Sequence, residues 1–253
     1  MKVKNVVKSL SLPALILCIG LGLVCPVSVQ AASNKVMKVA GLSFSNKKAK
    51  NSRRGAEMFA TLKETDKLSK KAMKLSGKVY IPKKAFKKAG DEIMISPELS
   101  LWKFPPVYDN NNAGIIYGKY DIILKYTKKK KLVLYKETGT KRKRTKAGKY
   151  ASVKKDGAYY CITIKKVPIT GPFLDEKDEE AAINTKDKFI LNAGFGVFST
   201  TKKAWKGTVC LDNIKLKSAK KTQTITFDKK DFQGTYANNW ASGGDKQASI
   251  AKK

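Results

Sequence analysis

The chain has 253 residues, of which 53 are lysine or arginine and 20 are acidic, and its net charge is +33. It contains no histidine, which excludes His-based catalytic triads, histidine acid–base catalysis and His-ligated zinc. Four of the basic residues are arginines, whereas nucleic-acid binders usually depend on arginine for bidentate contacts. We therefore expect a solvated lysine surface and no nucleic-acid partner.

The N-terminus has the layout of a secretory signal peptide. Three lysines precede an apolar stretch from Leu10 to Val29, and the stretch ends in small residues at Ala31 and Ala32. Pro13 and other helix breakers within the stretch disfavour the alternative of a transmembrane anchor. A lipoprotein signal at Cys25 is disfavoured because a lipobox needs a small residue where Val24 stands. We predict that residues 1–31 are a cleaved signal peptide, that the protein is secreted or at the cell surface, and that the mature chain has no membrane span.

Alternating apolar and polar residues predict β-strands through residues 35–232. The expected strands are 36–44, 56–62, 73–81, 92–102, 115–126, 131–136, 149–153, 158–165, 188–198, 207–217 and 222–228. Two hairpins are expected, one turning at residues 128–130 and one at Asp156-Gly157, which suits a type I′ turn. These strands predict an all-β domain, a two-sheet antiparallel β-sandwich of the jelly-roll type. The polar residues 233–253 are expected to form a loosely ordered tail.

Two cysteines remain after the signal peptide, Cys161 and Cys210, and both fall inside expected strands. Export permits a disulfide between them if their strands are neighbours. Two cysteines do not make a disulfide scaffold, so two free thiols are an equal alternative.

The polar faces of three expected strands carry aromatic rings beside hydrogen-bonding groups. Strand parity places Trp102 with Glu98 opposite an apolar face, and it places Tyr80, Tyr159 and Asn192 on the outer faces of their own strands. A sugar has apolar C–H faces and a polar hydroxyl rim, so it suits rings flanked by carboxylate and amide groups. We predict that the three rings stack on sugars while Glu98 and Asn192 bind hydroxyls. The alternative is that a loop covers the rings.

The segment Lys206–Leu216, KGTVCLDNIKL, resembles the closing strand of the jelly-roll carbohydrate-binding modules of secreted bacterial glycanases, which have a galactose-binding-like β-sandwich fold. The run Gly77–Pro82 resembles an early strand of such modules. The resemblance implies polysaccharide binding and a structural calcium ion held by Asp212, with Asp228 as a second ligand if the last two strands pair. The alternative is that Asp212 only binds the adjoining loop. Trp205, beside the closing strand, is expected to form a wall of the sugar site.

These observations predict a secreted, non-catalytic protein that binds polysaccharide through an aromatic-lined sheet face. One alternative is a cell-envelope structural protein held by lysine charge to an anionic cell-wall polymer, which high salt would release. A second is a jelly-roll polysaccharide lyase that uses tyrosine with lysine or arginine.

Overall fold

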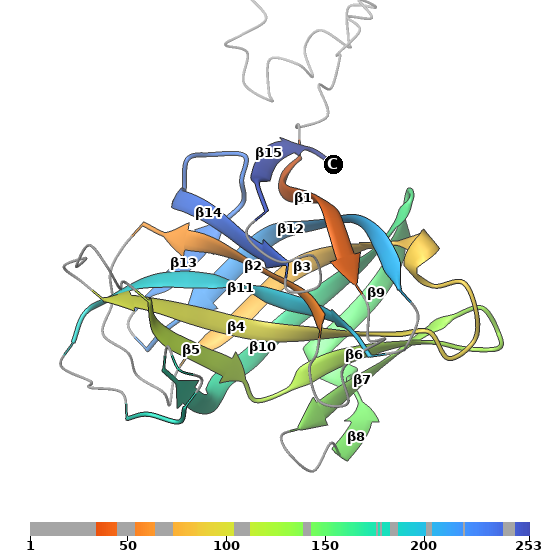
Figure 1. The fold of residues 1–253 in the computed structure, drawn as a ribbon, viewed down its shortest axis with the longest axis horizontal. Helices are drawn as coiled ribbons and strands as arrows, with labels where there is room; N and C mark the ends of the chain where they lie inside the picture. The colour runs from red at the N-terminus through yellow and green to blue at the C-terminus, as the bar shows by residue number, and fades with distance from the viewer. Residues whose placement is uncertain are drawn as a thin grey trace, which may run out of the picture. The chain divides into compact units, whose positions relative to one another are not determined.

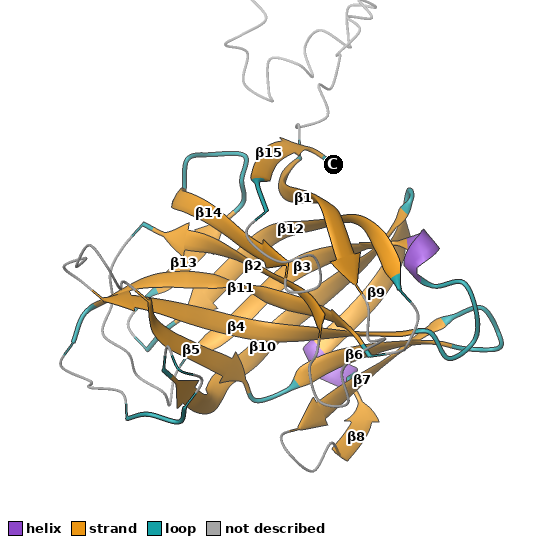
Figure 2. Cartoon of the chain, in the orientation of Figure 1, coloured by secondary structure: helices purple, strands orange, loops and turns teal. Residues whose placement is uncertain are grey.

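Alternating apolar and polar side chains form antiparallel β-strands through most of the chain (Figure 1, Figure 2). The computed structural model describes residues 34–44, 54–63, 73–103, 112–138, 143–175, 177, 179–182, 187–200, 204–219, 221–239 and 246–253. The predicted signal peptide, residues 1–31, lies outside them. Helix in this part of the chain is confined to two 3-10 turns, Lys83–Ala85 and Gly148–Tyr150, and none of its helices is long and apolar enough to cross a membrane.

The first sheet, sheet A, pairs its strands antiparallel in the order β9, β10, β3, β12, β1 and β15, and β13 pairs with the end of β12. Its strands are β1 (Lys35–Phe44), β3 (Lys74–Pro82), β9 (Ala151–Asp156), β10 (Tyr159–Leu174), β12 (Trp205–Lys217), β13 (Thr222–Ile225) and β15 (Ala248–Lys252). The strand that resembles a closing strand, β12, therefore lies between β1 and β3.

The second sheet, sheet B, follows the order β14, β2, β11, β4 and β5, and the first half of β4 pairs instead with β6, which continues to β7 and β8. Its strands are β2 (Arg54–Leu62), β4 (Glu92–Lys103), β5 (Asn112–Gly118), β6 (Asp121–Tyr126), β7 (Leu132–Thr138), β8 (Lys143–Lys146), β11 (Phe189–Ser199) and β14 (Phe232–Asn239). In Figure 1 these strands lie in front of those of sheet A.

The two sheets enclose one apolar core. Val79 and Leu211 of sheet A and Leu99 and Phe195 of sheet B are completely buried in it. Their neighbours in sequence point to the outer faces, as the period of two along a strand requires. The faces that can carry function are therefore the outer face of sheet A and the outer face of sheet B.

The sheets are joined along both edges. The long strand β10 pairs with β3 in its first half and with β5 from Ile169 onward, so it passes from sheet A to sheet B. At the other edge the buried Asn239 of β14 links the sheets, because its amide bonds the backbone of β1. The Ser43 N–H donates to Asn239 Oδ1 at 3.1 Å, and Asn239 Nδ2 donates to the carbonyl oxygens of Ser43 at 2.9 Å and Gly55 at 3.1 Å.

The all-β, two-sheet antiparallel sandwich predicted from the sequence is confirmed. The jelly-roll order of its connections stays a prediction. The expected strand 115–126 is divided at Lys119 and Tyr120 into β5 and β6. Strand β8 was missed because its four residues, KRTK, have no apolar member to mark a buried face.

The prediction of a loosely ordered tail over residues 233–253 is wrong. Most of β14 and all of β15 lie in this segment, and they pair with β2 and β1. The compact unit accordingly runs from Asn34 to Lys253 and does not end at residue 232. The polar composition concealed these strands because each lies at a sheet edge, where one side of the strand stays in solvent.

Both expected hairpins are confirmed. In the β9–β10 hairpin Asp156 pairs with Tyr159, so the turn consists of Gly157 and Ala158. The φ angle is 54° at Gly157 and negative at Ala158. A type I′ turn needs positive φ at both positions, whereas a glycine at the first position alone fits a type II′ turn.

Candidate functional site

The outer face of sheet B gathers three of the predicted site residues. Trp102 and Glu98 lie on β4, and Asn192 lies on the adjacent strand β11, where it pairs with Ser100. The apolar Leu99 and Leu101 of β4 face the core, so Glu98, Ser100 and Trp102 face outward. The strand parity read from the sequence therefore brings this group together as expected.

The carboxylate of Glu98 lies over a glycine of the next strand. A Cβ atom placed on Gly196 would approach Glu98 Oε1 to 2.3 Å and the ring of Phe198 to 2.4 Å. Glycine is thus the residue that leaves room for a carboxylate above β11. The side chain of Glu98 is 0 % exposed in this structure.

The side-chain amide of Asn192 has a hydrogen-bond partner for its oxygen but none, among the described residues, for its nitrogen. The hydroxyl of Thr61 on β2 donates to Asn192 Oδ1 at 2.7 Å. The Nδ2 group finds no hydrogen-bond acceptor among the described residues, and Asn192 is 1 % exposed. A buried amide donor without an acceptor costs about 1–3 kcal/mol, so Nδ2 is an unsatisfied donor beneath this face.

Aromatic rings border Glu98 on both sides of its cross-strand row. On one side Tyr117 of β5 pairs directly with Glu98. On the other side Glu98 pairs with Gly194 of β11. Gly194 pairs with Phe59 of β2, and Phe59 pairs with Tyr236 of β14. The rings of Phe59 and Tyr236 stack with centroids 5.9 Å apart and planes inclined by 18°. The row therefore has aromatic residues at both ends and a carboxylate beside a glycine between them.

Sequence reasoning missed the residues that only strand pairing brings to this face. Tyr117, Phe59, Tyr236 and the buried Glu57 lie on β5, β2 and β14, and Glu57 pairs with Gly196. The parity of β2, with Ala56 and Met58 in the core, is the signal that could have identified Glu57 as outward-facing. Nothing local could have placed the two tyrosines in the same cross-strand row as Glu98.

Tyr80 and Tyr159 do not join Trp102, and the predicted platform of three rings is wrong in this respect. Both tyrosines lie on the outer face of sheet A, where Tyr80 pairs with Cys161 on one side and Cys210 on the other. Strand parity predicts which face of its sheet a residue lies on, but which sheet the strand joins depends on the strands that it pairs with. Tyr80 is buried, and this burial is the largest cause of the rise in its pKa.

The two cysteines are free and buried. They flank Tyr80 in one cross-strand row, which separates their strands by two spacings, or about 9.6 Å. A disulfide needs Cα atoms within about 7 Å, so the bridge that the sequence left open does not form. Burial raises the pKa of the Cys210 thiol to about 11, which makes this thiol a poor nucleophile.

Trp205 belongs to the core of the sandwich and not to a wall of a sugar site. It begins β12 on sheet A, and its ring stacks on Phe44 of β1 with centroids 3.8 Å apart and planes inclined by 10°. The predicted wall is wrong because β12 begins at Trp205, and the alternation along this strand turns Trp205 to the core together with Val209 and Leu211.

Asp212 and Asp228, the two predicted calcium ligands, each have a partner in the structure. One carboxylate oxygen of Asp212 lies 3.5 Å from the ammonium group of Lys78 and accepts a hydrogen bond from Asn213 Nδ2 at 2.6 Å. Asp228 accepts a bond from the backbone N–H of Lys35 at 2.8 Å. Calcium needs six to eight oxygen ligands, and no group of three acidic or cysteine side chains occurs within the described residues. Calcium binding by Asp212 and Asp228 stays a prediction.

No protein-family model, curated protein or solved structure matches this chain. The resemblance to carbohydrate-binding modules therefore rests on the short sequence runs alone.

Proposed function

We propose that the protein is a secreted, non-catalytic binding protein that holds polysaccharide on the outer face of sheet B. The observation that carries the proposal is the cross-strand row that begins at Tyr117, passes through Glu98 and ends at Tyr236, with Trp102 on the same face. Aromatic rings beside hydrogen-bonding groups match the alternating apolar and polar surface of a sugar chain.

The rings and the polar groups have different parts in this site. Trp102, Tyr117 and Tyr236 are half-buried, so we assign to them the first contact with a sugar. Glu98 and Asn192 lie deeper, and both are completely or almost completely buried. Glu98 and Asn192 form the polar floor beneath these rings, and donation of a hydrogen bond from Asn192 Nδ2 to a ligand requires the side chains that cover it to move.

The ligand is an extended chain and not a single sugar. Tyr117 and Tyr236 are separated by four strand spacings, through β4, β11 and β2. This distance is about 19 Å. A polymer that crosses the strands reaches both rings, whereas a monosaccharide reaches one of them.

The test is retention in affinity gels that contain neutral polysaccharides, with wild-type protein, Trp102→Ala and Tyr159→Ala. Tyr159 is the matched control because it is a half-buried ring on the outer face of sheet A. We expect Trp102→Ala to weaken retention about tenfold, which corresponds to about 1.4 kcal/mol of lost stacking, and Tyr159→Ala to leave it unchanged.

Thermal unfolding of both variants confirms that they are folded before retention is compared. Equal retention of wild type and Trp102→Ala, or no retention on any polysaccharide in a broad panel, contradicts the proposal.

A further inference from the structure

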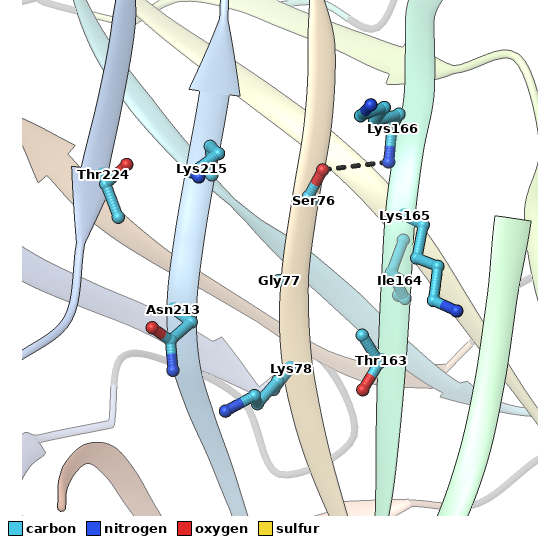
Figure 3. A pocket seen from close by; sticks show the side chains of 10 residues that line it. All are labelled: Ser76, Gly77, Lys78, Thr163, Ile164, Lys165, Lys166, Asn213, Lys215 and Thr224. Atoms are coloured by element: carbon cyan, nitrogen blue, oxygen red, sulfur yellow. Dashed lines mark hydrogen bonds between the residues drawn. The ribbon is translucent and has the colours of Figure 1, made fainter.

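The outer face of sheet A contains an open depression of about 360 Å³ between β13, β12, β3 and β10 (Figure 3). Four of the ten side chains or backbone segments that line it are lysines, and most of the others carry a hydroxyl or an amide. The residues are Ser76, Gly77, Lys78, Thr163, Ile164, Lys165, Lys166, Asn213, Lys215 and Thr224. No acidic residue is among them, so the depression concentrates positive charge.

Two β-bulges at the same level of the sheet create this depression. The register shifts on β10 between Ile164 and Val167 and on β12 between Asp212 and Lys215, so both neighbours of β3 carry extra residues opposite Ser76 and Gly77. One residue in each bulge has left-handed backbone, Lys166 with a φ of 49° and Asn213 with a φ of 50°. Bulges redirect side chains from the regular alternation, and here Lys165 and Lys166 are both exposed.

The hydroxyl of Ser76 is oriented for a ligand that accepts hydrogen bonds. The backbone N–H of Lys166 donates to Ser76 Oγ at 2.9 Å, as the dashed line in Figure 3 shows. This bond occupies a lone pair of the oxygen and leaves its proton available to an acceptor in the depression. Thr163 and Thr224 offer further hydroxyl groups at the same wall.

The charge of the lysines is largely free for a ligand. Lys78 is shared with the buried carboxylate of Asp212 at 3.5 Å. Lys165, Lys166 and Lys215 are exposed and make no ion pair with any described carboxylate. The charges of these three lysines are therefore available to an anionic ligand without displacing a protein carboxylate.

We propose that this depression binds the anionic groups of an acidic polysaccharide, either sulfate esters or uronate carboxylates. Lysine ammonium groups are compact charges that suit both oxyanions, and the hydroxyl and amide groups suit sugar hydroxyls. Nucleic acid is disfavoured because the lining has no arginine for bidentate phosphate contacts and no aromatic ring for base stacking. The site is separate from the face of sheet B that we assign to sugar stacking.

The experiment measures binding of dextran sulfate, polygalacturonate, neutral dextran and double-stranded DNA to the full chain in 50 mM NaCl. The site variant is Lys165→Gln with Lys215→Gln, and Lys78 is kept because it offsets the buried Asp212. The control is Lys128→Gln with Lys129→Gln in the exposed β6–β7 turn. Both double variants remove the same charge, so a difference between them reports position.

We expect the site variant to weaken binding of at least one acidic polysaccharide about tenfold and the control to change it by less than about twofold. The relative affinity for dextran sulfate and polygalacturonate identifies sulfate or carboxylate as the preferred group. Equal losses in both double variants would show a diffuse charge effect and overturn the site. Tighter binding of DNA than of both acidic polysaccharides, or no binding of either at 50 mM NaCl, also overturns it.

Discussion

The outer face of sheet B is closely packed around Glu98 and Asn192, whereas the outer face of sheet A opens into a depression with four lysines. The difference originates in the strands at the centre of each sheet. On sheet B, Gly196 of the regular strand β11 leaves space that Glu98 and Phe198 fill. On sheet A, bulges on both sides of β3 break the alternation, and the bulge on β10 exposes the consecutive residues Lys165 and Lys166. One sandwich thus offers two surfaces of different chemistry.

The largest expected effect concerns the two buried thiols of sheet A, Cys161 and Cys210, which flank Tyr80. In protein without Cys18 and Cys25, we expect a thiol reagent at pH 8 to react with Cys161 and Cys210 more than about a hundredfold more slowly in the native state than in urea. The pKa of Cys210 is about 11, so the thiol is almost fully protonated at pH 8. Labelling kinetics by absorbance measure this rate. Fast labelling of the native chain would show that the face around Tyr80 is open.

A substitution at Gly196 tests the close packing on sheet B. We expect Gly196→Ala to lower the free energy of unfolding by about 2 kcal/mol, because the new Cβ collides with Glu98 and Phe198. Gly234→Ala on β14 is the matched control, since the nearest atom to its Cβ is Thr61 Oγ1 at 3.8 Å. Urea unfolding measures both. Equal stability of the two variants would show that Glu98 does not need the space above Gly196.

A single hydroxyl tests the depression on sheet A more finely than the lysine pair does. We expect Ser76→Ala to weaken binding of the preferred acidic polysaccharide about threefold, because it removes one hydrogen-bond donor from the site. Thr222→Val, at an exposed position of β13 outside the lining, is the control and should bind like wild type. Isothermal titration calorimetry measures both affinities. An unchanged affinity in Ser76→Ala would remove Ser76 from the site.

The smallest expected effect is the ion pair between Asp156 and Lys253, which lies near Tyr80 on sheet A. The hydrogen bond from Lys253 is the largest cause that holds the pKa of Asp156 below its usual value. The resulting stability is therefore present at neutral pH and is lost as pH falls through the lowered pKa. We expect Asp156→Asn to cost less than about 1 kcal/mol at pH 7 and less again at low pH, where the carboxylate becomes protonated. Urea unfolding at the two pH values measures this; a cost that is as large at low pH would contradict the ion pair.

The sequence predicts the strands well because one face of each strand must be apolar. Leu99, Leu101 and Leu191 alternate with Ser100 and Asn192, and this alternation places both the core and the outward residues correctly. The polar edge strands β8, β14 and β15 escaped prediction because they bury few side chains, and their backbone pairing leaves no apolar pattern.

The sites could be predicted only in part because pairing across the sheets is not a local property. Parity correctly made Tyr80 an outward residue of its strand, but its partners Cys161 and Cys210 placed it on sheet A, away from Trp102. The lysine depression depends on two bulges, at which Lys166 and Asn213 have positive φ. Asparagine often adopts this conformation, but lysine does not, so the sequence does not mark the bulge on β10.

The separation of the two surfaces is tested most directly by one glycan array that carries neutral and acidic polysaccharides. Wild-type protein, Trp102→Ala and the Lys165→Gln, Lys215→Gln double variant are applied to it under the same salt. The account predicts that Trp102→Ala loses neutral glycans and keeps binding through its lysines, whereas the lysine variant loses acidic glycans and keeps neutral ones. Parallel loss of both glycan classes in both variants would contradict two separate binding surfaces.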